Sequence, residues 1–148
     1  MGLAFYFTVR QANKIDIVKN FYETSGFSLA RIKGPNRISE EGIVTLEVAE
    51  GIISDIKFRF PGSDGDSFID GKPRKGKTKD WVIKREMQTK PGSIFNRIIL
   101  EADIKRLYAT SLFDDVKVSL EPDSSNPGKV IILLDLSEQR TGSLTGGL

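Results

Sequence analysis

The sequence predicts an α+β fold built from two consecutive small modules, each a three-stranded mixed sheet with two helices on one face (βααββ). The first observation behind this prediction is that segments with apolar residues at helical spacing precede segments in which alternate residues are apolar. The second is an internal repeat, in which residues 17–32 align with residues 103–118. The identical pairs are Lys19 and Lys105, Tyr22 and Tyr108, Thr24 and Thr110, Ser25 and Ser111, and Phe27 and Phe113.

The first module is predicted to occupy residues 1–51 and to show only its last helix and a hairpin. A helix is expected over residues 12–25, because Ile15 and Val18 recur at helical spacing and Gly26 is suited to cap its end. The elements expected after it are a strand over residues 27–32, a turn over residues 34–42 and a strand over residues 43–49. An opening strand and helix are either missing from this chain or not recognisable at its start.

The second module is predicted to be complete over residues 52–139, with only Glu50 and Gly51 before it. Its expected elements are a strand at 52–60, a polar loop at 61–77, a helix at 78–88 capped by Thr78, a helix at 97–110 capped by Asn96, and strands at 115–121 and 129–137. The apolar residues expected in phase are Ile52, Ile56, Phe58 and Phe60 in the first strand, and Leu100, Ile104, Leu107 and Tyr108 in the second helix. The last strand, with VIILLDL, is the more apolar of its hairpin, which suits the centre of the sheet and leaves residues 115–121 at an edge.

The composition excludes several classes of active site. The chain has 22 Lys and Arg against 20 Asp and Glu, a net charge of +2 that is too even to indicate nucleic-acid binding. It has no His and no Cys, so Cys/His zinc sites, thiol nucleophiles and histidine bases are excluded. The carboxylates are expected on solvent faces or in turns. No catalytic residue, metal ligand or cofactor is therefore expected, and the chain is predicted not to be an enzyme.

One motif favours a different function. Residues 71–78 read GKPRKGKT and match the phosphate-binding pattern G-x-x-x-x-G-K-[ST], while Asp135 ends an apolar strand as a magnesium-orienting acid does. A phosphate loop should join a buried strand directly to a helix, but a polar stretch precedes Gly71, and Pro73 has no N–H to offer a phosphate. A P-loop nucleotide hydrolase therefore stays as the weaker alternative. A nucleotide-binding assay with magnesium distinguishes it from a protein without nucleotide chemistry.

Residues 51–138 resemble a POTRA domain, the polypeptide-transport-associated module. The resemblance rests on the strand IISDIKFRF, the turn KPGSIFN, the phrase LYATSLFDDVKV and the strand KVIILLDLSE. Residues 13–51 resemble the end of a preceding POTRA domain, and RTGSLTGGL, at residues 140–148, resembles the entry into the first strand of a membrane barrel. The likeness is to the cyanobacterial and chloroplast branch of the BamA-like outer-membrane assembly and translocation pores. Ser111 departs from the pattern, because the family often has Gly there.

The resemblance implies a function without covalent chemistry. Such modules lie on the periplasmic side of the outer membrane, or in the equivalent compartment of the plastid envelope. They receive unfolded outer-membrane or precursor polypeptides, lie beside their own membrane β-barrel, and dock accessory assembly subunits. A scaffold that docks only sister subunits is an alternative within the same class. Nucleic acid is not an expected partner.

Two segments are candidates for contact with polypeptides. The edge strand is suited to pair with an extended client through the residues Val116, Lys117, Val118, Ser119 and Leu120. The polar loop 61–77 is expected to be exposed and mobile, because its composition cannot bury enough surface to order itself. Its candidates for a pore-facing role are Phe68, Ile69, Lys72, Arg74 and Lys75. Each segment also has a simpler interpretation, since charges on an edge prevent aggregation and polar loops are commonly solvated insertions.

Overall fold

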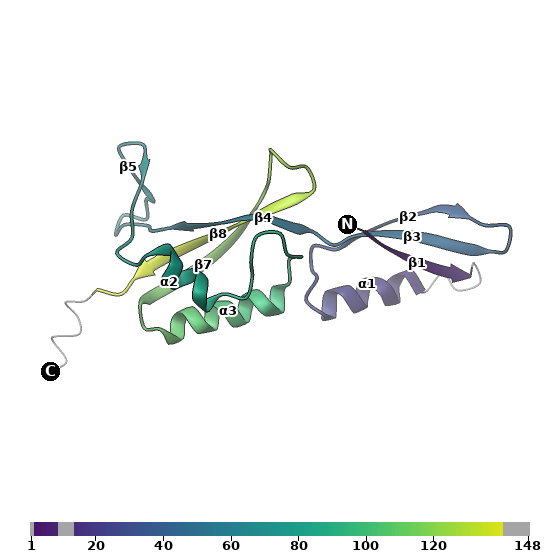
Figure 1. The fold of residues 1–148 in the computed structure, drawn as a ribbon, viewed down its shortest axis with the longest axis horizontal. Coiled ribbons are helices and arrows are strands. Elements are labelled where there is room, and N and C mark those ends of the chain that lie inside the picture. Colours follow the sequence, from purple (N-terminus) through teal and green to yellow (C-terminus); the bar gives the residue numbers. More distant parts are fainter. Residues whose placement is uncertain (1, 9–13, 141–148) are drawn as a thin grey trace.

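The computed structural model describes residues 2–8 and 14–140 of the chain. Figure 1 shows two modules that follow one another end to end, each with helix on one side of a small sheet. Neither described range contains a helix that is long and apolar enough to cross a membrane. The expected barrel-entry strand at residues 140–148 lies outside the described residues, apart from Arg140.

The first module contains β1 (Gly2–Thr8), α1 (Lys14–Thr24), β2 (Arg31–Ile38) and β3 (Ile43–Ala49). Its sheet has the order β1-β3-β2, and β3 is antiparallel to both neighbours. The expected helix and second strand are confirmed, and Val44, Leu46 and Val48 are buried as their alternation predicts. The sequence pattern did not indicate β1. It lies beside the last strand of its sheet, as the opening strand of the second module does, but it is antiparallel to that last strand, whereas the opening strand of the second module is parallel to it.

The first strand of the hairpin lies further along the chain than expected. Residues 27–30 form turns instead, and the Ala30 N–H donates to the carbonyl oxygen of Phe27 at 3.0 Å. β2 begins after this turn and continues through the Gly34-Pro35 pair, which was expected to form a turn. The ladder to β3 is interrupted at that pair, where Gly34 has a φ of 118°. A bulge of this kind lets a strand contain residues that are typical of turns.

The second module contains β4 (Ile52–Arg59), β5 (Phe68–Ile69), β6 (Lys72–Pro73), α2 (Asp80–Glu86), α3 (Arg97–Ala109), β7 (Phe113–Pro122) and β8 (Lys129–Glu138). The main sheet has the order β4-β8-β7, with β8 parallel to β4 and antiparallel to β7. The predicted α+β class, the mixed sheet and the central position of the last strand are confirmed. Figure 1 shows α2 and α3 on the same side of this sheet.

The first helix of this module is shorter than expected. Its N-cap is Lys79, whose side chain makes no capping hydrogen bond, and the helix ends at Glu86. Thr78 was expected to be the cap but has a different contact, because its N–H donates to Glu138 Oε1 at 2.6 Å. The second helix begins as predicted, with Asn96 Oδ1 accepting from the N–H groups of Ile98 and Ile99.

The core of the second module lies between its main sheet and α3. The side chains buried there without solvent exposure are Ile53, Ile83, Leu107, Ile132, Leu134 and Leu136. β4 differs from the expected phase, because a register shift between Ile53 and Asp55 puts Ile53 in the core and leaves Ile52 only half-buried. Tyr108 was expected on the core stripe but is 41% exposed. The bulge explains the first difference, since one extra residue reverses the side-chain alternation.

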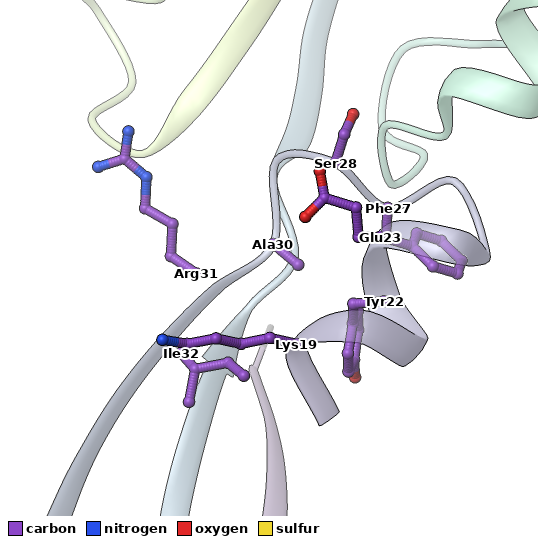
Figure 2. A pocket seen from close by; sticks show the side chains of 8 residues that line it. All are labelled: Lys19, Tyr22, Glu23, Phe27, Ser28, Ala30, Arg31 and Ile32. Carbon is purple, nitrogen blue, oxygen red and sulfur yellow. The ribbon is translucent and has the colours of Figure 1, made fainter. Parts of the chain in front are cut away.

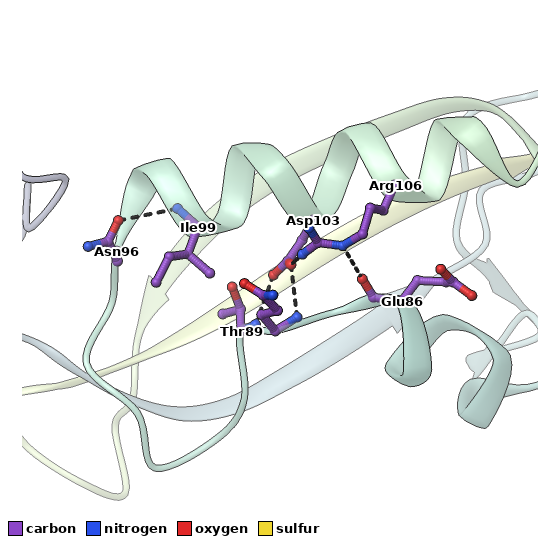
Figure 3. Close-up of polar contacts among 7 residues, drawn as sticks. Glu86, Thr89, Asn96, Ile99, Asp103 and Arg106 are labelled. Carbon is purple, nitrogen blue, oxygen red and sulfur yellow. Dashed lines mark hydrogen bonds and ion pairs between the residues drawn. The ribbon is translucent and has the colours of Figure 1, made fainter.

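A buried carboxylate connects α3 to the segment after α2. Asp103 is fully buried, contrary to the expectation that the carboxylates face solvent. It accepts hydrogen bonds from the N–H groups of Gln88 and Thr89, both at 2.8 Å, and from the Arg106 guanidinium. Arg106 also donates to the carbonyl oxygen of Glu86 at 2.8 Å. Figure 3 shows this network bridging the end of α2 and the middle of α3.

The two modules meet where α1 ends and α3 begins. Asn96 Nδ2 donates to the carbonyl oxygen of Ser25 at 3.0 Å, and the Arg97 N–H donates to that of Gly26 at 2.7 Å. Leu29 of the first module packs against the core of the second. The carbonyl end of one helix therefore faces the N–H end of the next, an arrangement in which the two helix dipoles attract.

The joint requires glycine at one position. Gly26 has a φ of 94°, and a Cβ atom there would lie 2.3 Å from Asn96 Oδ1, the atom that caps α3. A side chain would therefore displace the cap as well as strain the backbone. At the equivalent end of α3, Ser111 has a φ of 58°, so it adopts the left-handed conformation that glycine would adopt more easily.

Candidate polypeptide-binding edges

β7 lies at the edge of its sheet, with β8 on one side and no other strand of the described chain on the other. The Val116 N–H points away from β8, because it donates to the hydroxyl oxygen of Tyr108 at 2.9 Å. Main-chain groups of an antiparallel strand alternate in direction, so those of Val118 and Leu120 also point to the free side. The first amide of this edge is thus occupied by a side chain of α3, and the next two residues are open.

The side chains of β7 separate into two faces. Val116 is buried and Val118 half-buried toward the core, whereas Leu120 is 39% exposed. Lys117 and Ser119 are exposed on the other face, and Lys117 Nζ lies 3.7 Å from Asp115 Oδ2. The five predicted edge residues are therefore brought together on one strand. They differ in how available they are to a new strand, because the N–H of Val116 already donates to Tyr108.

The polar loop is largely exposed, as predicted, but it contains a small hairpin although its composition was expected not to let it order itself. β5 and β6 pair in an antiparallel ladder around Asp70 and Gly71, which have φ values of 51° and 74°. Phe68 and Ile69 are 48% and 52% exposed, and Lys72 and Lys75 are exposed beside them. Two residues with positive φ form the turn that suits a tight hairpin.

The hairpin is anchored at its base by packing over glycines. Arg74 Nη2 lies 3.2 Å from Asp64 Oδ2, and its guanidinium lies so close to Gly62 that a Cβ atom there would be 2.5 Å from Arg74 Cζ. Arg74 is therefore half-buried, unlike the other cations of the predicted pore-facing set. The ring of Phe60 lies equally close to Gly76. Neither glycine accepts a side chain without displacing an aromatic or guanidinium group.

The GKPRKGKT segment does not have the geometry of a phosphate loop. Its first residues form the turn and β6, and the N–H groups of Lys77 and Thr78 donate to the Glu138 carboxylate at 3.0 and 2.6 Å. Burial raises the pKa of Glu138, but these two hydrogen bonds, together with the Thr78 hydroxyl and the charge of Lys77, hold the pKa below its ordinary value. Asp135 is bound to Arg59 at 2.6 and 2.8 Å. The groups that would hold a phosphate and a magnesium ion therefore have other partners.

A hollow of about 380 Å³ lies in the first module between α1 and β2. Figure 2 shows Lys19 and Arg31 with Glu23 around it, so its charges are mixed. Tyr22 at its floor donates to Glu50 Oε1 at 3.1 Å, and burial together with this carboxylate raises the pKa of Tyr22 to about 12. The tyrosine is therefore a structural link between helix and strand rather than an acid.

Sequence reasoning missed the groups that occupy edge amides. Tyr108 binds the Val116 N–H on one edge, and Asp55 Oδ1 accepts from the Ile56 N–H at 2.8 Å on the other. The repeat aligns Tyr108 with the buried Tyr22, so its position suggested a core residue. An aspartate one residue before an apolar strand position is the only signal that marks the second group.

The comparisons agree with this geometry. Residues 68–139 match the family described as POTRA, surface antigen variable number repeat. The solved structure of POTRA1-3 of the periplasmic domain of Omp85 from Anabaena has 36% sequence identity and a TM-score of 0.79, covering 93% of this chain and 54% of that chain. The chain is built from POTRA modules. The expected resemblance is thereby confirmed.

Two of the sequence relatives are chloroplast proteins. Outer envelope protein 80 of Arabidopsis thaliana is 30% identical over 106 residues, which are 72% of this chain. Protein TOC75 of Oryza sativa is 28% identical over 125 residues, which are 83% of this chain. The chain spans 14% of the length of each. The predicted location of the POTRA modules is confirmed. It is the periplasmic side of the outer membrane, or the equivalent compartment of the plastid envelope.

Proposed function

We propose that these POTRA modules bind polypeptides without catalysis, as part of an outer-membrane assembly or translocation protein. Their clients are unfolded outer-membrane or precursor polypeptides, and their partners are the protein's own membrane β-barrel and accessory assembly subunits. The family and the envelope location of the relatives support this proposal.

The observation that carries the proposal is the open end of β7. At Val118 and Leu120 the main-chain donors and acceptors face the free side of the sheet. An extended client strand gains affinity there through main-chain hydrogen bonds, without the requirement for one sequence. Such pairing suits segments of barrel proteins, whose strands are about ten residues long and alternate between apolar and polar residues.

We expect that Val118→Pro weakens the binding of an unfolded barrel protein while the module stays folded. The Val118 N–H faces the free side, so proline removes an edge donor and leaves the ladder to β8 in place. One lost main-chain hydrogen bond corresponds to about 1 kcal/mol, or about fivefold in affinity. The measurement is photo-crosslinking of the unfolded client to the whole chain at a series of concentrations.

Val118→Ala is the matched control, because it shortens the same side chain and keeps the N–H. Circular dichroism establishes that both variants are folded. Equal crosslinking of the folded Val118→Pro variant and of Val118→Ala would contradict client binding at this edge. Crosslinks to accessory subunits alone, with no client, would favour the scaffold that docks only sister subunits.

The hairpin tip is proposed as a second contact, with the barrel mouth or a passing chain. Phe68 and Ile69 are exposed at the tip, with Lys72 and Lys75 exposed beside them, and Arg74 fixes the base through Asp64. An ordered hairpin holds its tip side chains at a defined position, which an irregular loop does not.

The double substitution Phe68→Ser and Ile69→Ser is expected to reduce assembly activity in cells at unchanged stability. Both side chains are exposed, so the free energy of unfolding should change by less than about 0.5 kcal/mol. Barrel-protein levels in the outer membrane report the activity, and urea unfolding of the purified chain reports the stability. The substitution Ser63→Gly, at an exposed position of the same loop away from the tip, serves as the control. Normal assembly with the tip variant would favour a solvated insertion.

A further inference from the structure

A groove of about 550 Å³ lies on the opposite edge of the same sheet, between β4 and the segment that follows α2. Its apolar lining comes from Ile56 and Phe58 on one side and from Met87 and Pro91 on the other. It is distinct from the edge at β7, because β8 separates the two outer strands. The groove is therefore a separate surface from the one that carries the proposed client binding.

The edge of β4 is covered over its first half only. Gly92 donates to the Ile53 carbonyl oxygen at 2.7 Å, and the Ile53 N–H donates to that of Ser93 at 2.9 Å. Beyond this contact, the described chain has no strand on the free side of β4. The Ile56 N–H points to that side, since it donates to Asp55 Oδ1, and by alternation the main chain of Phe58 points there too.

A buried hydroxyl in the groove has no hydrogen-bond partner. Thr89 is only 6% exposed and lines the groove, and its Oγ1 lacks any partner among the described residues. Its own N–H is bound to Asp103, so the residue is held in place from the other side. Buried hydroxyls in proteins are almost always paired, and leaving one unpaired is unfavourable. A bound molecule with a polar group at this position would supply the missing partner.

The rim of the groove is cationic. Lys84, Arg85 and Lys90 lie around it, against one carboxylate, Asp55, which already accepts from an N–H group. Arg85 pairs with Glu86, but within the described ranges neither lysine makes an ion pair. The charge at this surface therefore favours an anionic ligand.

We propose that this groove binds an extended acidic segment of a partner polypeptide. Its main chain pairs with β4 at the Ile56 carbonyl oxygen and at the N–H and carbonyl groups of Phe58, since the Ile56 N–H is bound to Asp55. Its apolar side chains lie on the groove floor. Its carboxylates lie near Lys84 and Lys90, and one of its polar groups pairs with the Thr89 hydroxyl. The recognition is by alternating apolar and acidic residues, which distinguishes this segment from a client selected by main-chain pairing alone.

The test measures binding of a labelled ten-residue peptide of alternating Val and Glu to the whole chain by fluorescence anisotropy, with an alternating Val and Lys peptide for comparison. The acidic peptide should bind at least tenfold more tightly. The double substitution Lys84→Glu and Lys90→Glu should weaken its binding about tenfold, and Thr89→Val about fivefold. Lys19→Glu, the same kind of charge change on α1 of the first module, should have less than a twofold effect.

Two further readouts separate this site from the edge at β7. Addition of the acidic peptide should shift the backbone amide resonances of Ile56 and Phe58, and the Lys84→Glu and Lys90→Glu variant should lose these shifts. Equal affinity for the acidic and basic peptides would overturn the proposal. So would unchanged binding in the folded Lys84→Glu and Lys90→Glu variant, or shifts confined to β7.

Discussion

Replacing Asp103 with Ala should lower the free energy of unfolding by about 3–5 kcal/mol, one of the two largest effects expected in this chain. The carboxylate is fully buried and accepts from Gln88, Thr89 and Arg106. Its removal leaves two buried N–H groups without acceptors and a guanidinium without its counter-charge. Urea unfolding followed by circular dichroism measures the change, with the midpoint and slope read separately.

Two variants make this expectation specific. Asp103→Asn keeps the shape and one acceptor oxygen, so its cost should be smaller, about 1–3 kcal/mol. Glu101→Ala removes an exposed carboxylate from the same helix, one that pairs with Arg97, and should cost less than about 0.5 kcal/mol. A loss below about 1 kcal/mol for Asp103→Ala would show that water replaces the carboxylate.

Leu107→Ala and Phe113→Ala should each destabilise the second module by about 2–5 kcal/mol. Leu107 is fully buried and Phe113 is 4% exposed, and both belong to the core between α3 and the sheet. Truncation leaves a cavity that the surrounding strands fill only in part, so the cost exceeds that of transferring the lost atoms to water. Thermal and urea unfolding report the change.

The matched control is Leu112→Ala, because Leu112 directly precedes Phe113 in the chain but is 38% exposed. It should change the free energy of unfolding by less than about 0.5 kcal/mol. If Leu112→Ala costs as much as Leu107→Ala, the core of the second module is not confined to the buried side chains described above.

The strands were predictable where alternation was strong and unbroken. β3 and β8 have apolar residues at every second position, and both lie at the centres of their sheets. The strand after Gly26 was misplaced because the alternation of Phe27 and Leu29 does not belong to a sheet: Phe27 packs against Tyr22 in its own module. Leu29 packs on the core of the second module, a contact that no local pattern contains.

The polar groups of the molecule were the least predictable. A carboxylate within an amphipathic helix usually faces solvent. The position of Asp103 in the sequence therefore does not indicate that the segment after α2 covers its side chain. Glu138 is similar, since its partners at Lys77 and Thr78 come from a distant loop. The candidate edge strand was predictable from the relative hydrophobicity of two strands. The pairing of Val116 with Tyr108 was not, because it depends on how α3 is rotated over the sheet.

The occupied amides on both edges have a consequence for how long a bound chain stays. Tyr108 and Asp55 each remove one donor from a short edge, so an added strand finds few main-chain bonds. Differences in affinity between related complexes arise mainly in the dissociation rate. At about 1 kcal/mol for each hydrogen bond, every donor withheld shortens the lifetime of the complex about fivefold. A polypeptide held in the proposed way would therefore leave by thermal motion alone, and the edge would then be free for the next segment.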